Sequence, residues 1–503
     1  MKNKTYILVC LLCLSSGLMA CAKTPQEEIV VDRSEGIPKE SILEKDDDVP
    51  KDLQIPDHWH EKIERSDGFV TLEADYSPQI PEIYNTPVDV YEQSVLTNEL
   101  LEKLCDYFSD GNPLYEYPKM TKDELESEKA RMENYEGTWA SLSGGLGSTQ
   151  YWQDQLSKMD QLIDEAPEKA GTKNSIKPVL MEPVQTERDF YDGVSDYYYD
   201  TDEKLGFTAK IDKENEKNPL IRAISYSDKL GSTTNFLYSQ GTFIDEEYLM
   251  PLIHGNLDSN NKNDAWLKSL KEHMEEIPSL SEEEALNEAK ALLDKLSIKG
   301  FEVGSCVKAI GNRNTETWVL WDEDNPFNEV GFSIYFYRTL GDLMGYSQRS
   351  PEILEGIPET VYAPQFSSEK IQIIITKDGV QKFAWTNMSK KIDTVANNTK
   401  LLSFDEIKEK LADHLLYSAL SDDGDELKDT GTKCIYNVTN IQIRAANINA
   451  FEEPEKVWLV PVWVFNLEKT GLTSDGEVLK WGTENVVLNA IDGGFVSIKQ
   501  GEG

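Results

Sequence analysis

The stretch VWLVPVWVFNLE, from Val457 to Glu468, decides the fold, because it is an apolar run typical of a strand in a sheet core. Two strand-like runs flank it: CIYNVTNIQIRA, which begins at Cys434, and ENVVLNAIDGGFVSI, which begins at Glu484. Trp458 and Trp463 lie inside the central run, and we interpret them as core residues rather than a binding platform. The three runs predict antiparallel strands of one sheet.

A helix is expected directly before these strands. The sequence SFDE, from Ser403 to Glu406, has the pattern of a capping box. After it, Ile407, Leu411 and Leu415 recur at helical spacing. Residues 401–503 are therefore expected to form a unit in which a helix lies across one face of an antiparallel sheet.

The same order of elements occurs once before, as a weak internal echo. SEEE, from Ser281 to Glu284, is a capping box, and it precedes an apolar helix face at Leu286, Ala289, Leu293 and Leu296. Strand-like runs follow as TWVLW, VGFSIYFY and IQIIITKDGVQKFAW, the last with a tight hairpin turn at its Asp-Gly pair. We expect a second helix-plus-sheet unit at residues 278–395.

Residues 57–270 predict an N-terminal α+β domain that contains a helical hairpin. FVTLEADY, from Phe69 to Tyr76, alternates apolar and polar residues as a half-buried strand does. Thr97 then caps a helix, and further helices are expected at 122–135 and 150–165. GFTAKID, PLIRAISYS and STTNFLYS predict an antiparallel meander. The predicted fold class is α+β, with antiparallel sheets each covered by a helix, arranged as several units in series after a disordered tether.

The N-terminus predicts export and a lipid anchor. Two lysines precede a short apolar run, far below the roughly 20 residues that span a membrane, so residues 1–20 are typical of a lipoprotein signal peptide. LMAC, from Leu18 to Cys21, resembles the lipobox of bacterial lipoproteins, in which diacylglycerol is attached to the cysteine sulfur. We expect lipidation of Cys21, since two acyl chains hold a protein stably on a membrane. The alternative is a plain secretory signal that leaves Cys21 as a free thiol.

Composition limits the partners that the chain can have. With 91 acidic and 50 basic residues its net charge is −41, which opposes binding to nucleic acid and to anionic headgroups. Residues 21–56 are charged, proline-punctuated and without hydrophobic periodicity, which predicts an acidic flexible tether. Cys105, Cys306 and Cys434 are too few and too scattered for a disulfide framework, which suits a Gram-positive envelope.

Motifs that carry chemistry are scarce. His58 and His60 would point to the same side of a strand, but zinc needs three or four ligands, so we interpret them as surface histidines and predict no metal site. The acidic stretches 258–264 and 422–425 depart from calcium-loop spacing and are expected to be solvated turns. No GxSxG occurs, and no pair of carboxylates stands out for glycoside hydrolysis. We predict no catalytic residue and no cofactor.

Several motifs together resemble a known group of proteins. The VPVW strand, the closing NAIDG hairpin at Asn489–Gly493 and the capped helix before them resemble PepSY-like domains of Gram-positive surface proteins. The whole chain is similar to an uncharacterised family of Firmicute lipoproteins, through its lipobox, its acidic tether, DHWHE and NPLYEYPKMTKDELE. The resemblance implies a small C-terminal module connected with peptidase regulation or envelope sensing, and it carries over no catalytic residue.

Together these features predict a lipid-anchored protein on the outer face of the cell membrane that binds, senses or regulates an envelope component without its own catalysis. Its candidate partners are the membrane, through Cys21, and an envelope protein or peptide. Two alternatives stay open. One is a surface hydrolase that acts on wall glycans or peptides through unidentified carboxylates. The other is a structural or assembly partner of an envelope complex.

Overall fold

The fold is known from a computed structural model of the whole chain. The structure describes residues 39–43, 50–94, 96–116, 120–127, 129–130, 149–169, 171–180, 206–213, 219–224, 234–247, 272–313, 329–346, 361–362, 364, 366–417, 427, 430–450, 453 and 456–496. Within these residues the chain forms two large sheets with helices packed against them, which confirms the predicted α+β class.

The first sheet is formed by the middle of the chain, and its described part has ten strands. Nine of them run in the order β5-β6-β7-β8-β15-β14-β11-β10-β9, and β12 pairs with β11 at the side. The pairs along this path are antiparallel, and β6, β7 and β8 are the predicted meander. The bounds are β5 (Leu114–Glu116), β6 (Gly206–Ile211), β7 (Leu220–Ile224), β8 (Thr234–Ser239), β9 (Thr242–Asp245), β10 (Phe301–Asn312), β11 (Glu329–Leu340), β12 (Leu343–Met344), β14 (Lys370–Thr376) and β15 (Gly379–Thr386).

Two amphipathic helices pack on one face of this sheet. They are α2 (Asn98–Ser109) and α9 (Glu282–Leu296), whose apolar residues share one core cluster with Phe236, Ile334 and Phe383 of the sheet. Thr97 caps α2 by accepting a bond from the backbone N–H of Leu100, and Ser281 and Glu284 form the predicted capping box of α9. A further helix, α4 (Thr149–Glu165), belongs to a separate small cluster that includes Met159.

The second sheet has nine described strands and contains the stretch VWLVPVWVFNLE. Seven of them follow the order β13-β21-β20-β19-β18-β3-β2, while β4 pairs with both β16 and β19. The pairs β3–β18 and β13–β21 are parallel. The bounds are β2 (Trp59–Glu64), β3 (Val70–Tyr76), β4 (Val88–Gln93), β13 (Val361–Tyr362), β16 (Ser389–Ala396), β18 (Lys433–Asn449), β19 (Lys456–Leu472), β20 (Val478–Asn489) and β21 (Phe495–Val496).

The helix α10 (Phe404–Tyr417) covers the second sheet, with contacts to β3 and β20. Its first turn carries the predicted capping box, in which the backbone N–H and the hydroxyl of Ser403 both donate to Glu406 Oε2. Trp463 is fully buried, and its ring lies 5.8 Å from that of Phe404. The long central strand is therefore a core strand, as its sequence predicts.

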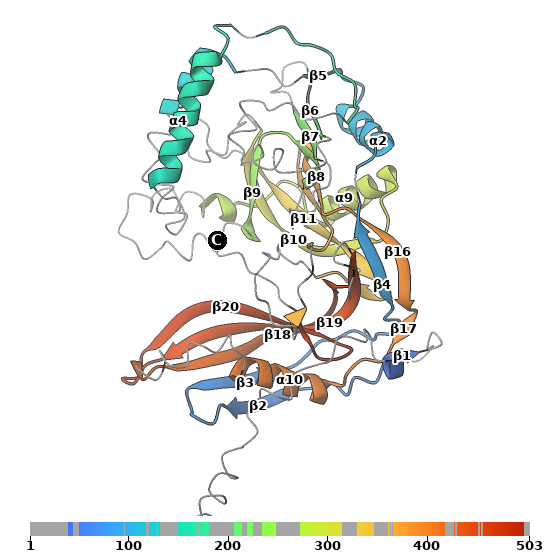
Figure 1. Cartoon of the computed structure of the whole chain (residues 1–503), viewed down its shortest axis with the longest axis vertical. Coiled ribbons are helices and arrows are strands. Elements are labelled where there is room, and N and C mark those ends of the chain that lie inside the picture. The colour runs from blue at the N-terminus through green and yellow to red at the C-terminus, as the bar shows by residue number, and fades with distance from the viewer. Residues whose placement is uncertain are drawn as a thin grey trace, which may run out of the picture.

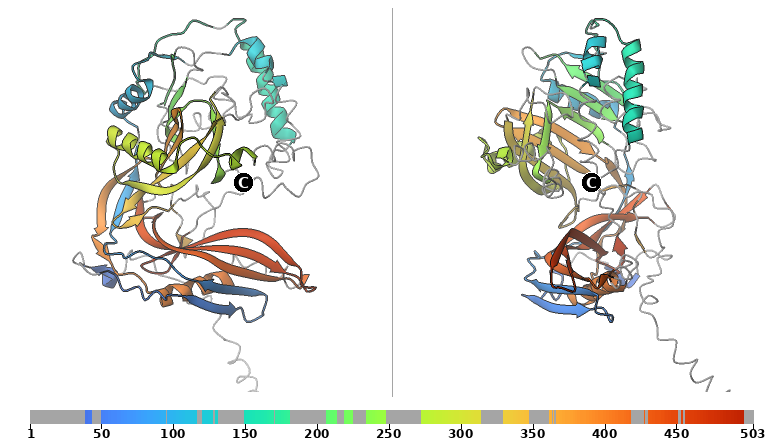
Figure 2. Two further views of the ribbon diagram at one scale, coloured as in Figure 1. Left: turned by 180° about the vertical axis from the view of Figure 1, so that it is seen from behind. Right: turned by 90° about the vertical axis from the view of Figure 1, so that its left-hand side faces the viewer.

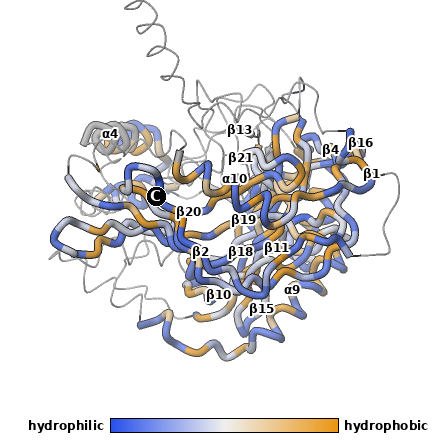
Figure 3. The backbone as a smooth tube through the Cα atoms, turned by 90° about the horizontal axis from the view of Figure 1, so that it is seen from below, coloured by the Kyte–Doolittle hydropathy of each residue, from blue (hydrophilic) through white to orange (hydrophobic). Residues whose placement is uncertain are grey.

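The two sheets occupy opposite ends of the molecule (Figures 1 and 2). The strands β4 and β16 run beside each other along one side between them (Figure 1). Further contacts join the halves: the backbone N–H of Tyr346 donates to Ala445 O at 2.6 Å, and Asp342 Oδ2 accepts from the N–H groups of Tyr84 and Asn85. Along many strands hydrophobic and hydrophilic residues alternate, as expected of sheets with one covered face (Figure 3).

The strand pairing departs from the predicted division into consecutive domains. The strands β2 and β3, which the sequence assigned to the predicted domain of residues 57–270, pair in the sheet of the C-terminal unit 401–503. The meander β6–β8 joins β15 of the unit 278–395 in a single sheet. The reason for the difference is that pairing between distant segments leaves no trace in local periodicity, which shows only where a strand begins and ends.

The folded part also begins within residues 21–56, which were predicted to form a flexible tether. Within 21–56, the strand β1 (Ile42–Leu43) pairs with β17 (Asn398–Thr399), and Lys51 Nζ donates to Asn398 Oδ1 at 2.9 Å. Leu53 is buried in the core of the second sheet. The residues that make these contacts stand singly or in pairs among charged residues. The sequence therefore shows no periodic pattern that would have predicted a folded segment here. Among the described residues, none of the helices combines the length and apolar character that a membrane span requires.

Candidate metal centre

Two histidines and one aspartate meet on the hairpin formed by β2 and β3. The register of the hairpin places His60 directly opposite Asp75. His58 lies two residues before His60, so both imidazoles emerge on the same side of the strand. The residue between them, Trp59, points the other way and is buried against the rings of Phe404 and Phe465. The buried tryptophan therefore fixes which side of the strand the histidines face.

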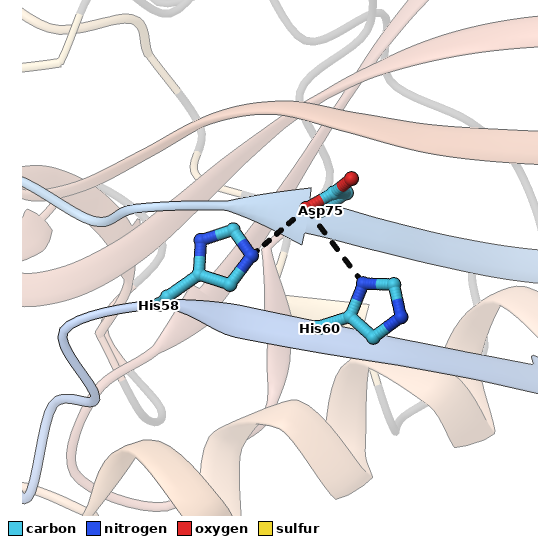
Figure 4. Close-up of side chains that lie close together, drawn as sticks. All are labelled: His58, His60 and Asp75. Atoms are coloured by element: carbon cyan, nitrogen blue, oxygen red, sulfur yellow. Dashed lines mark ion pairs between the residues drawn. The ribbon is translucent and has the colours of Figure 1, made fainter.

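The three side chains converge on one point (Figure 4). His58 Nε2 lies 2.8 Å from Asp75 Oδ1, and His60 Nδ1 lies 3.7 Å from the same oxygen. One ligand atom from each residue lies within 4.8 Å of the others. The two imidazole rings are nearly parallel, with an interplanar angle of 11°. All three side chains face solvent, with 51%, 79% and 75% of the side chains of His58, His60 and Asp75 exposed.

This donor set is one that binds divalent transition metals. Imidazole nitrogen and carboxylate oxygen are both common ligands of zinc, whereas calcium and magnesium prefer oxygen ligands throughout. Ser77 supports the set, because its Oγ lies 3.0 Å from His58 Nδ1. A hydrogen bond at one ring nitrogen leaves the other nitrogen to face the ligand, which is how metal-binding histidines are commonly oriented.

The sequence named the two histidines but missed Asp75. The prediction of no metal site rested on the absence of a third ligand, and pairing of the hairpin brings a candidate third ligand, Asp75, next to the histidines. The signals for it were present: DHWHE at 57–61, the alternating strand at 69–76 and the turn residues Asp67 and Gly68 between them. Pairing the two strands across that turn would have placed Asp75 opposite His60.

The other histidines in the described residues have separate surroundings. His273 Nδ1 lies 2.8 Å from Glu276 Oε1 on the same exposed turn, with no third ligand in the described residues. The ring of His414 stacks on Phe495 with a centroid distance of 3.9 Å, and burial lowers its pKa to about 4. Neither histidine extends the cluster on the hairpin.

The described cysteines do not offer a reactive site. Cys105 and Cys434 are buried, and Cys306 is half-buried. Burial raises the pKa of Cys105 and of Cys306 to about 12, which keeps both as neutral thiols. Three features singled out in the sequence lie outside the described residues: Cys21 and the acidic stretches 258–264 and 422–425.

Two polar networks inside the first sheet were not foreseen from the sequence. Asp245 Oδ2 accepts from the hydroxyls of Ser333 and Tyr335 and from Gln372 Nε2, at 2.5–2.9 Å. Glu369 is buried and accepts from Trp385 Nε1 and from the guanidinium of Arg338. Burial raises the pKa of Glu369 despite that cation. Both carboxylates are held by partners within the protein, which suits a structural role.

No protein-family model and no curated protein matches this chain. Among solved structures it is similar to an uncharacterized protein from Eubacterium rectale ATCC 33656, at 12% sequence identity. The match covers 90% of this chain and 96% of that chain, with a TM-score of 0.38. The likeness is too distant to bear on the fold or on the function.

Proposed function

We propose that this chain is a lipid-anchored binding protein on the outer face of a bacterial membrane, without catalysis of its own. The observation that carries the proposal is the sequence SSGLMAC, in which a cysteine follows a short apolar run and small residues. A thiol there has no evident use outside the cell unless it is acylated. The C-terminal unit, which we propose is PepSY-like, supports a role in sensing or regulation.

The charge of the chain supports a partner that is neither nucleic acid nor a bare anionic surface. A net charge of −41 repels both, and only the lipid would overcome the repulsion from anionic headgroups. The segment between Cys21 and the first described residue, Lys39, reaches at most about 60 Å when fully extended. The folded part would therefore stay within that distance of the membrane and meet envelope proteins, peptides or ions there.

The test is to replace the cysteine and follow both lipid and location. Cells that make the wild type, Cys21→Ala or Cys13→Ala are labelled with a clickable palmitate analogue and then fractionated. We expect label and membrane association for the wild type and for Cys13→Ala, which removes a cysteine of the apolar run. Cys21→Ala should lose both. If Cys21→Ala stays labelled or stays in the membrane fraction, the anchor is elsewhere and the proposal fails.

A further inference from the structure

We propose that His58, His60 and Asp75 form a binding site for a divalent transition-metal ion of the zinc type. The site would use two imidazole nitrogens and one carboxylate oxygen. It does not depend on the lipid anchor, because all three ligands lie in the folded hairpin. The inference names a ligand class for the binding role proposed above.

The geometry is close to what a tetrahedral ion requires. With ligands at about 2.0–2.1 Å from zinc, two ligand atoms of a tetrahedron lie about 3.3 Å apart. The two distances measured to Asp75 Oδ1, 2.8 Å from His58 and 3.7 Å from His60, fall on either side of that value. The third separation, between the two imidazole nitrogens, is within 4.8 Å, so the side chains would have to rotate to bring all three ligand atoms to the ion.

The backbone of the site is held in place before any ion binds. His60 and Asp75 are direct partners in the β2–β3 register. Trp59 is 4% exposed and packs edge-on against Phe404 of α10, with ring centroids 5.3 Å apart. Its indole Nε1 donates to Glu61 Oε2 at 2.9 Å, which also holds the residue that follows His60. A site on a rigid, paired strand loses little conformational entropy on binding.

The nearest lysine of the hairpin does not oppose a cation. Lys62 lies on the same side of β2 as His60, but its Nζ lies 2.8 Å from Glu73 and 3.4 Å from Glu64. The charge of Lys62 is therefore paired with two carboxylates. Lys62 therefore does not stand as an unpaired positive charge that would repel a cation at the site.

Three ligands leave at least one coordination position open on a tetrahedral ion. Structural zinc sites are closed by four protein ligands, whereas sites that bind an exchangeable group keep one position free. Because the three side chains are exposed, an open position here would face solvent. A ligand from outside the chain could occupy it, which agrees with a binding role better than with a structural one.

The experiment is a titration of the purified full-length protein in detergent with Zn²⁺, followed by calorimetry. The same protein is then titrated with Co²⁺, whose visible bands report tetrahedral coordination. We expect one ion per chain for the wild type. His60→Ala and Asp75→Asn should each weaken binding by more than tenfold, since the loss of even a supporting group outside the ligand set costs roughly 10–100-fold.

The control variant is His273→Ala, which removes a half-buried histidine whose Nδ1 also lies 2.8 Å from a carboxylate, Glu276, but which has no third ligand among the described residues. It should bind zinc as the wild type does. Tryptophan fluorescence checks that each variant keeps the fold of the wild type. The inference is overturned if the wild type binds no ion, or if His60→Ala and Asp75→Asn bind as tightly as the wild type.

The result of the zinc titration can be distinguished from the result of the lipid-labelling experiment. Cys21→Ala should bind zinc unchanged, and His60→Ala should still be labelled with lipid and stay in the membrane fraction. Failure of zinc binding in a labelled protein would reject the metal site alone. Loss of the label in a zinc-binding protein would reject the anchor alone.

Discussion

Replacing His414 should change how the stability of the protein depends on pH. The imidazole lies in the last turn of α10 and stacks on Phe495 of β21. A helix C-terminus favours a protonated histidine by about 0.3–1 kcal/mol, but burial is the larger influence and lowers the pKa from 6.5 to about 4. The folded protein therefore keeps this residue neutral at pH values where the unfolded chain protonates it.

The sign and size of the effect follow from that difference. Between pH 6.5 and 4 the unfolded state binds a proton that the folded state does not, so stability falls as the pH falls. At pH 5 the loss from this one residue amounts to about 2 kcal/mol, and it approaches about 3 kcal/mol below pH 4. His414→Phe keeps an aromatic ring against Phe495 and removes the titration.

The assay is urea unfolding, followed by tryptophan fluorescence, of the wild type, His414→Phe and the control His273→Gln, a half-buried histidine on another segment, at pH 7.5 and pH 5.0. The difference in unfolding free energy between His414→Phe and the wild type should move by about 2 kcal/mol in favour of the variant at the lower pH. The control should follow the wild type. A difference that is the same at both pH values would refute the reasoning that burial keeps His414 neutral.

Two further substitutions test the packing of each sheet, and both are read out by urea unfolding at pH 7.5. Phe404→Ala removes a ring that is 1% exposed and packed between Trp59 and Trp463, so we expect a loss of about 3–5 kcal/mol. A loss below about 1 kcal/mol would mean that α10 does not close the core. Glu369→Ala leaves Arg338 and the indole N–H of Trp385 without their shared acceptor, which should cost about 3–5 kcal/mol. Glu369→Gln, which keeps an acceptor oxygen, should cost less; equal losses would argue against this account.

Local features of the fold could be predicted from the sequence. The caps at Thr97, Ser281 and Ser403 act on the turn that follows each of them, so three or four residues contain the whole signal. The alternation of apolar and polar residues in β3 and the apolar run of β19 likewise indicate which of their own residues are buried. For this reason the α+β class, the meander and most helix starts agree with the structure.

Features that depend on pairing between distant segments could not be predicted. Periodicity places Val70 in a strand but does not show that the strand lies parallel to β18, whose Cys434 is its partner. The burial of Leu53 likewise comes from a core built largely by the C-terminal half. The cluster of His58, His60 and Asp75 shows the same limit at short range, since Asp75 joins the histidines only through the register of the hairpin.

The second sheet can be completed only after most of the chain has been synthesised, because it pairs early strands with late ones. The hydroxyl of Tyr76 donates to Asn440 Oδ1, across 364 residues of sequence. The strands β2 and β3 are synthesised early and therefore cannot complete their sheet until nearly the whole chain has been made. Sheets closed by such long-range pairing form slowly, and their early segments stay exposed to proteases and to other chains in the meantime. A net charge of −41 makes such unfinished chains repel one another, which opposes their association during this interval.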